Sequence, residues 1–205
     1  MKPLGDEVID GPEALARYLD HHGAFITHRS LAGYVQMKTR VHLSELLKEK
    51  RFYNAFERAR WDGYVAVVGD LSLIAWGYLR GAEQQGAAAT LDAAIVAVHD
   101  RVLSGHRAPA HLPEGWSPAC AAFGARIGQA RFAPPRQAGE VAYASGNAIF
   151  DALPIHVDLR KWDRDSVVGG VRFLVVSAVQ PLSRLIRPAP LLAALLAGQA
   201  RPPSE

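Results

Sequence analysis

Hydrophobic positions recur every three to four residues along most of the chain, which is the period of an amphipathic helix. The clearest case lies between residues 29 and 64, where the apolar side chains share one side of a helical wheel. These side chains are Leu31, Val35, Leu46, Tyr53, Phe56 and Tyr64. A basic stripe, as we call it here, lies on the other side of the wheel and consists of Arg29, Arg40, Lys48, Arg51 and Arg58. The pattern predicts a helix with a buried apolar side and a solvated cationic side.

Helix boundary signals divide the chain into several elements. Pro12 predicts the start of a short helix that ends near His22. A single rod from there to Trp61 would be longer than about 45 Å, so we expect a break at Gly33 or at the Trp61-Asp62-Gly63 turn. Further helices are expected over residues 91–103, 117–132, 140–153 and 159–185, with a short final helix after Pro188.

Two apolar segments fit more than one secondary structure. Residues 64–79 can form a core helix or a hairpin of two strands around Gly69-Asp70, and residues 167–179 are rich in β-prone side chains. The helical period outweighs the alternating one. We therefore predict a mainly α fold, an irregular single-domain bundle of six to eight helices, with an α+β fold containing a hairpin at 64–79 as the alternative.

Length and composition are those of an ordinary globular domain. The chain has 205 residues, of which 49% are hydrophobic and 21% charged. One domain over residues 1–205 is expected, with loose ends at about 1–10 and 198–205. The longest stretch without a charge, Pro188–Ala200, is 13 residues long, which is short of the ~20 that a membrane-spanning helix needs. A single cysteine, Cys120, and the absence of a secretory leader favour a cytoplasmic location.

Charge is distributed unevenly. Residues 28–60 carry eight lysines and arginines against three glutamates, a local excess of +5, although the net charge of the whole chain is only +3. The basic stripe can be solvated surface, a contact for a protein partner, or a contact for nucleic acid or anionic lipid. The acidic blocks elsewhere and the lack of a DNA-binding motif disfavour nucleic acid.

Metal and cofactor signatures are missing from the sequence. None of the eight histidines has an Asp or Glu three or four residues before it, as a carboxylate-bridged metal site on helices requires. No phosphate-binding glycine loop or nucleophile elbow is present. We therefore expect no metal and no cofactor. His42 and Glu45 lie one helical turn apart and could act as an acid–base pair, although the wheel places His42 in the apolar stripe and favours a core histidine.

Asp70 is the most unusual polar residue, because it interrupts an apolar segment. A buried carboxylate must be paired, must cap a helix or must have a function. We expect it to cap a new helix after Gly69, with pairing to Arg60 or Arg172 and catalysis as the alternatives.

The sequence thus predicts a cytoplasmic interaction protein or subunit of a complex, without enzymatic activity, that uses the basic stripe to bind another protein or a second copy of the chain. The first alternative is an enzyme or small-molecule-binding bundle that uses His42, Glu45 and Asp70. These would lie around an aromatic cavity built from Tyr53, Phe56, Tyr64 and Trp76. The second alternative is nucleic-acid binding through the basic stripe.

Overall fold

The computed structural model describes residues 7–82, 88–130, 141 and 143–199. About 80% of these residues are helical and none belongs to a sheet, which confirms the mainly α fold class. The helices are α1 (Pro12–Thr39), α2 (Leu43–Leu46), α3 (Lys50–Ala82), α4 (Ala88–Ser104), α5 (Ser117–Ala130), α6 (Ser145–Ala152), α7 (Val157–Arg160), α8 (Arg164–Leu185) and α9 (Pro188–Gln199). The described residues thus hold nine helices, against the six to eight predicted: seven have eight or more residues, and α2 and α7 are single turns.

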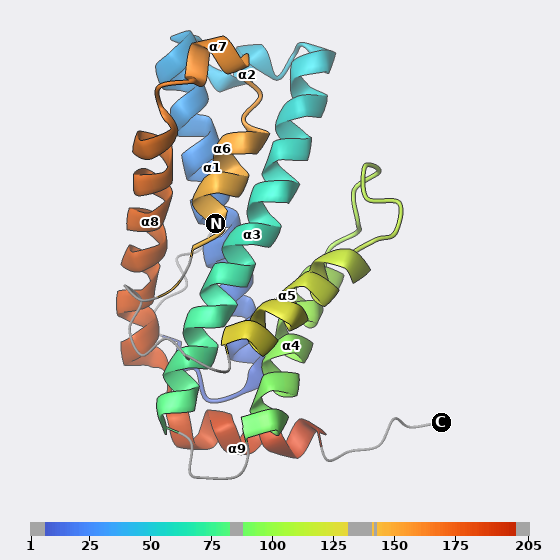
Figure 1. Cartoon of the computed structure of the whole chain (residues 1–205), viewed down its shortest axis with the longest axis vertical. Helices are drawn as coiled ribbons and strands as arrows, with labels where there is room; N and C mark the ends of the chain where they lie inside the picture. Colours follow the sequence, from blue (N-terminus) through green and yellow to red (C-terminus); the bar gives the residue numbers. More distant parts are fainter. Residues whose placement is uncertain (1–6, 83–87, 131–140, 142, 200–205) are drawn as a thin grey trace.

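Three long helices, α1, α3 and α8, run along the long axis of the molecule (Figure 1). The short α6 packs against α3 and α8, α4 packs against both α1 and α3, and α5 contacts both α4 and α3. Helix α9 crosses one end of the bundle and contacts α4. The core fills the space between these helices, with Trp76 of α3 fully buried.

The predicted helix breaks are in the wrong places. Helix α1 continues through Gly33 to Thr39, and α3 continues through Trp61 and Gly63. The chain turns instead at Arg40, which ends α1 in the left-handed conformation with φ 56° and donates its backbone N–H to the carbonyl of Gln36. Left-handed caps are usually glycine or asparagine. An arginine therefore gave no signal of this turn in the sequence.

Two glycines permit close helix packing rather than turns. A Cβ on Gly63 would lie 2.9 Å from Ile149 and 3.0 Å from Thr27, and a Cβ on Gly23 would lie 2.6 Å from Val68. Gly63 on α3 therefore lets α1 and α6 pack closely against α3. Gly23 on α1 likewise lets α3 pack closely against α1.

Both ambiguous segments are helical. Residues 64–79 lie inside α3 and residues 167–179 inside α8, so the hairpin alternative is wrong. The run from Val67 to Gly77 is buried without interruption, because α1, α4 and α6 pack around this part of α3. Enclosure on several sides explains the lack of a polar face in the sequence, since a helix that is apolar all round is a buried one.

The two chain ends lie partly outside the described residues, at 1–6 and 200–205. Within the described part, Ile9 is buried and forms a parallel bridge with Ile186. Its N–H donates to Leu185 and its carbonyl accepts from Arg187, at 2.9 Å each. The segment before α1 is thus anchored from Ile9 onward to the end of α8.

Helices α3 and α8 are long and apolar enough to cross a membrane, by length and composition alone. In α3, 67% of the most apolar window is buried inside the molecule, as in the core helix of a soluble protein, whereas the figure for α8 is 22%. Length and composition alone are weak evidence that a helix spans a membrane, so the expected absence of a membrane span stays a prediction.

Candidate functional site: a cationic, aromatic pocket between α1 and α3

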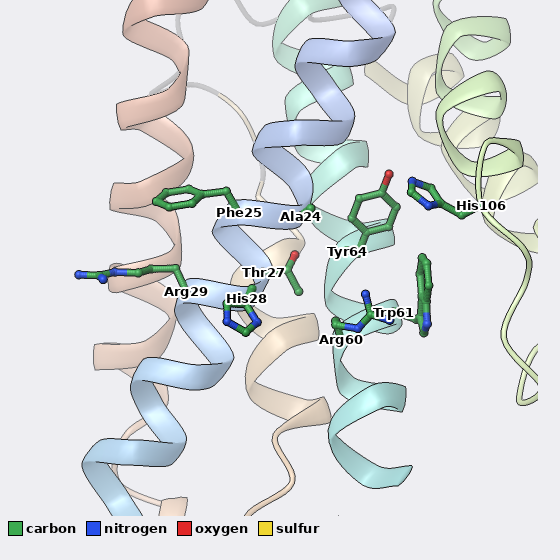
Figure 2. A pocket seen from close by; sticks show the side chains of 9 residues that line it. All are labelled: Ala24, Phe25, Thr27, His28, Arg29, Arg60, Trp61, Tyr64 and His106. Carbon is green, nitrogen blue, oxygen red and sulfur yellow. The ribbon is translucent and has the colours of Figure 1, made fainter. Parts of the chain in front are cut away.

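A pocket of about 490 Å³ opens between the middle of α1, the first half of α3 and the loop after α4. Its size lies within the ~300–1,000 Å³ of typical small-molecule sites. The lining residues are Ala24, Phe25, Thr27, His28, Arg29, Arg60, Trp61, Tyr64 and His106 (Figure 2). Aromatic rings and cationic or titratable nitrogens dominate this set, and none of the described lining residues is acidic.

The back wall of the pocket contains an unpartnered hydroxyl group. Thr27 is 1% exposed, and its Oγ1 has no hydrogen-bond partner among the described residues. Its methyl group is held against the position of Gly63 on α3. A buried hydroxyl without a partner costs about 1–3 kcal/mol. The Thr27 hydroxyl is therefore a buried polar group of the wall that a ligand could satisfy.

One edge of the pocket is organised by the carboxylate of Asp20. The hydroxyl of Tyr64 donates to Asp20 Oδ1 at 2.6 Å, and His106 Nε2 lies 2.8 Å from the same oxygen. Burial, followed by the hydrogen bond to Asp20, raises the pKa of Tyr64, so this phenol stays protonated and donates. Trp61 packs edge-on against both rings, at 5.5 Å from His106 and 5.7 Å from Tyr64. These contacts hold a rigid aromatic wall.

Arg60 places a positive charge at the pocket. Glu57 accepts from its Nε at 2.9 Å and from its Nη2 at 2.7 Å, and its guanidinium lies 4.5 Å from the centre of the Trp61 ring. Nη1 has no partner among the described residues and remains available to an anion. Arg29 and Phe25 form the outer edge, where the Arg29 guanidinium points away from the centre (Figure 2).

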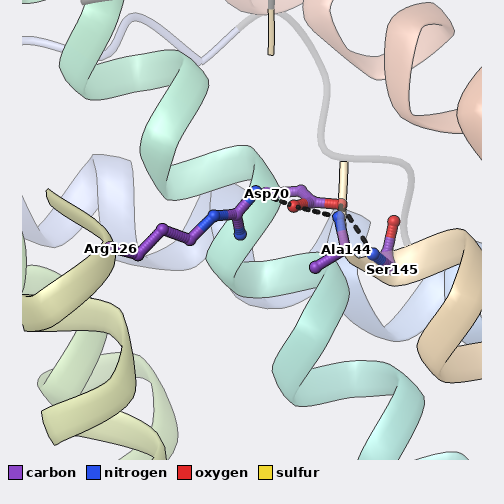
Figure 3. A network of polar contacts seen from close by, with 4 residues as sticks. All are labelled: Asp70, Arg126, Ala144 and Ser145. Atoms are coloured by element: carbon purple, nitrogen blue, oxygen red, sulfur yellow. Dashed lines mark hydrogen bonds and ion pairs between the residues drawn. The ribbon is translucent and has the colours of Figure 1, made fainter. Parts of the chain in front are cut away.

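Asp70 lies elsewhere, in a closed polar cluster between α3, α5 and α6 (Figure 3). Its side chain is 0% exposed and accepts from Arg126 Nη2 at 2.5 Å. It also accepts from the backbone N–H groups of Ala144, at 3.1 Å, and Ser145, at 2.9 Å. Asp70 does cap a helix, but the helix is α6 rather than a new one after Gly69. Its arginine is Arg126, not Arg60 or Arg172. Every described contact makes this carboxylate a structural one.

A smaller cavity of about 180 Å³ borders this cluster and is lined in part by His99, Phe123 and Arg126. His99 is 1% exposed, and its ring stacks on Phe123 with 4.2 Å between centroids. Burial lowers the pKa of His99 to about 4, so this histidine is neutral at physiological pH. It is a packed core residue.

His42 and Glu45 do not belong to either cavity. His42 is exposed at the start of α2, so its expected place in the apolar core is wrong. The error follows from the misplaced helix break, because the wheel assumed one continuous helix through Arg40. Glu45 is also exposed and pairs with Lys48 at 2.7 Å. The three residues proposed from the sequence as a joint site are thus not brought together.

The basic stripe is distributed over three elements rather than one helix. Arg29 is on α1, Arg40 caps it, Lys48 follows α2, and Arg51 and Arg58 lie on α3. All five side chains are exposed. Only Arg29 lines the pocket.

The predicted aromatic cavity is correct in one residue. Tyr64 lines the pocket, whereas Phe56 and Trp76 are buried in the core and Tyr53 is 44% exposed on the surface. Cys120 donates to Asp100 at 3.1 Å, and its pKa is raised to about 12 by burial and then by this carboxylate, so it is not a reactive thiol. Within the described ranges no group of three or more His, Cys, Asp or Glu side chains could hold a metal ion.

Most pocket residues were missed from the sequence. A signal was present on α3, where Tyr64 lies four residues after Arg60 and three after Trp61, the spacings at which side chains on a helix are neighbours. His106, however, meets Asp20 across 86 positions of sequence, and no local pattern links the two. Comparison of the chain with protein-family models, with curated proteins and with solved structures finds no match.

Proposed function

We propose that this chain binds a small molecule with a flat apolar body and one acidic group in the pocket between α1 and α3. The observation that carries the proposal is the chemistry of the lining. Aromatic rings flank a space of about 490 Å³ that has positive charge at Arg60 and no described carboxylate on its wall. A small number of placed polar groups in an otherwise apolar cavity is the usual composition of a ligand site.

The same lining supports binding rather than catalysis. The acidic groups nearby, Asp20 and Glu57, are already occupied by Tyr64, His106 and Arg60. They hold the wall in place. A planar ligand could stack between Trp61 and the edge of the pocket while its anionic group meets Nη1 of Arg60 and a polar atom accepts from the hydroxyl of Thr27.

A matched pair of probes tests this proposal. Binding of 2-naphthoate and of its neutral isostere 2-naphthamide should be followed by calorimetry. A charge-assisted hydrogen bond contributes about 1.5–3 kcal/mol, so the carboxylate should bind at least about 10-fold more tightly. In Arg60→Gln that preference should disappear. In the matched control Arg58→Gln, an exposed arginine two positions earlier on α3 that does not line the pocket, it should remain.

Thr27→Val provides an independent check of the same site. Valine has the shape of threonine without the hydroxyl, so the free protein should be as stable as the wild type or slightly more stable. The variant should bind 2-naphthoate more weakly, because its wall no longer offers a donor to a carboxylate oxygen of the probe. Equal affinity for the two probes in the wild type, or an unchanged preference in Arg60→Gln, would contradict the proposal.

The protein-interaction function and the cytoplasmic location expected from the sequence stay predictions. The exposed cations of the basic stripe are compatible with both predictions. The pocket has no bearing on either.

A further inference from the structure

Large apolar side chains are exposed together at one end of the bundle. The most exposed of them are Trp162 (86%), Leu159 (65%), Met37 (62%) and Val157 (58%). They belong to α7, to the turn after it and to the last turn of α1. Asp163 ties these segments together, because it pairs with Lys38 at 2.5 Å and accepts from the hydroxyl of Tyr34 at 2.6 Å. Figure 1 shows α7 and α2 at this same end. We call it the α2–α7 tip.

Exposed cations accompany the apolar side chains. They are Arg40, Lys48, Lys50, Arg51 and Lys161. Lys161 lies 5.4 Å from the ring centre of Trp162, and Lys48 pairs with Glu45. Arg40, Lys50 and Arg51 have no ion pair with any described residue. Residues 38–51 and 157–165, which form the tip, carry eight lysines and arginines against five carboxylates, among them the exposed Asp158 on α7, so the local charge of the tip is +3.

We propose that the α2–α7 tip docks on an anionic lipid bilayer, with Trp162 and Leu159 entering the headgroup region and the cations contacting anionic lipids. Exposed tryptophan and aliphatic side chains beside lysine and arginine are the composition of interfacial membrane anchors. Each such cation contributes to attraction by an anionic leaflet. The inference is independent of the ligand proposed for the pocket.

The other partners fit this surface less well. Nucleic acid would take the cations but would leave Leu159, Val157 and Met37 in water. Protein interfaces are depleted of lysine at their core, whereas Lys161 lies directly over Trp162. A bilayer accommodates both kinds of side chain at different depths, because the apolar groups insert while long cationic side chains reach the headgroups.

Co-sedimentation with vesicles tests the proposal. The full chain should bind vesicles of an equal mixture of phosphatidylcholine and phosphatidylserine and should bind pure phosphatidylcholine much more weakly. Arg40→Gln combined with Arg51→Gln should weaken partition to the anionic vesicles by about 30-fold, at roughly fivefold for each cation. The matched control, Arg107→Gln with Arg184→Gln, removes the same charge from exposed positions outside the tip and should have little effect.

Tryptophan emission reports which part of the surface enters the lipid. Trp76 is 0% and Trp116 is 8% exposed and Trp61 is partly buried in the pocket wall, whereas Trp162 is 86% exposed. A blue shift on vesicle addition should therefore come from Trp162 and vanish in Trp162→Phe. Trp162→Ala should weaken binding several-fold. The control Phe173→Ala, which removes another exposed aromatic side chain on α8 (70%), should not.

Three results would overturn the proposal. The first is no binding to the anionic vesicles, and the second is equal binding to both vesicle types with the arginine variants unchanged. The third is a greater loss in Phe173→Ala than in Trp162→Ala, which would place the contact on the face of α8. Tight binding of duplex DNA by the wild type, lost in Arg40→Gln with Arg51→Gln and without vesicle binding, would assign the tip to nucleic acid instead.

Discussion

Asp70 and Asp20 are both carboxylates on long helices, but they differ in solvent exposure. Asp70 is a buried, structural group, whereas Asp20 is accessible to solvent. Asp70 is completely enclosed and receives bonds from Arg126 and from two backbone N–H groups at the start of α6. The side chain of Asp20 is 43% exposed, and it holds Tyr64 and His106 at the edge of a cavity. A carboxylate whose donors come from the backbone fixes the fold. One that orients other side chains can prepare a binding surface.

The largest expected effect concerns the enclosed carboxylate. Asp70→Asn should lower the free energy of unfolding by about 3–5 kcal/mol, because it removes the buried negative charge that accepts from Arg126 and places an amide NH₂ against backbone donors. Urea unfolding at neutral pH measures this loss. A loss below ~1 kcal/mol would mean that the cluster does not hold α6 in place.

The next effect is a pH dependence near the same cluster. The ordinary pKa of histidine, 6.5, applies to the unfolded chain, whereas burial holds the pKa of folded His99 near 4. Between these values the unfolded chain binds more protons, so stability should fall as the pH drops. His99 alone should account for about 2 kcal/mol between pH 7 and pH 5.

The variant His99→Leu isolates this contribution. His22, whose pKa burial also lowers to about 4, adds a loss of the same sign in the wild type. The free energies of unfolding at the two pH values should therefore lie about 2 kcal/mol closer together in His99→Leu than in the wild type. If the free energy of unfolding changed by the same amount between pH 7 and pH 5 in both proteins, His99 would have to be accessible to protons in the folded state.

A smaller effect is expected at the accessible carboxylate. Asp20→Asn keeps an acceptor for Tyr64 and remains partly solvated, so the free energy of unfolding should fall by only about 1 kcal/mol. The binding of 2-naphthoate should change more, since the aromatic wall loses the group that holds Tyr64 and His106. Destabilisation equal to that of Asp70→Asn would remove the distinction between the two carboxylates.

The smallest effect is expected on the surface. Replacing Arg40, Lys48, Arg51 and Arg58 together by Gln should cost less than about 1 kcal/mol in urea unfolding, because exposed ion pairs contribute little. The pairs that are lost are Lys48–Glu45 at 2.7 Å and Arg58–Asp62 at 4.0 Å. Outright unfolding of this variant would show that the cations are part of the fold.

The sequence by itself determined the helical class and the cationic character of residues 29–58, because both follow from local spacing and composition. It also marked Asp70 as a buried carboxylate with a capping or pairing role, since an ionised group in an apolar segment has few alternatives. These inferences need no knowledge of how distant segments meet.

Only the tertiary structure decided which distant residues meet. The left-handed turn at Arg40 has no glycine to announce it, and it reverses the chain so that α1 faces α3 and separates His42 from the core. The contact of Asp20 with His106 and the cap of α6 by Asp70 join residues 86 and 75 positions apart. Helical periodicity defines which face of a helix is buried but not which helix covers it, so the pocket and the α2–α7 tip exist only once the helices are packed.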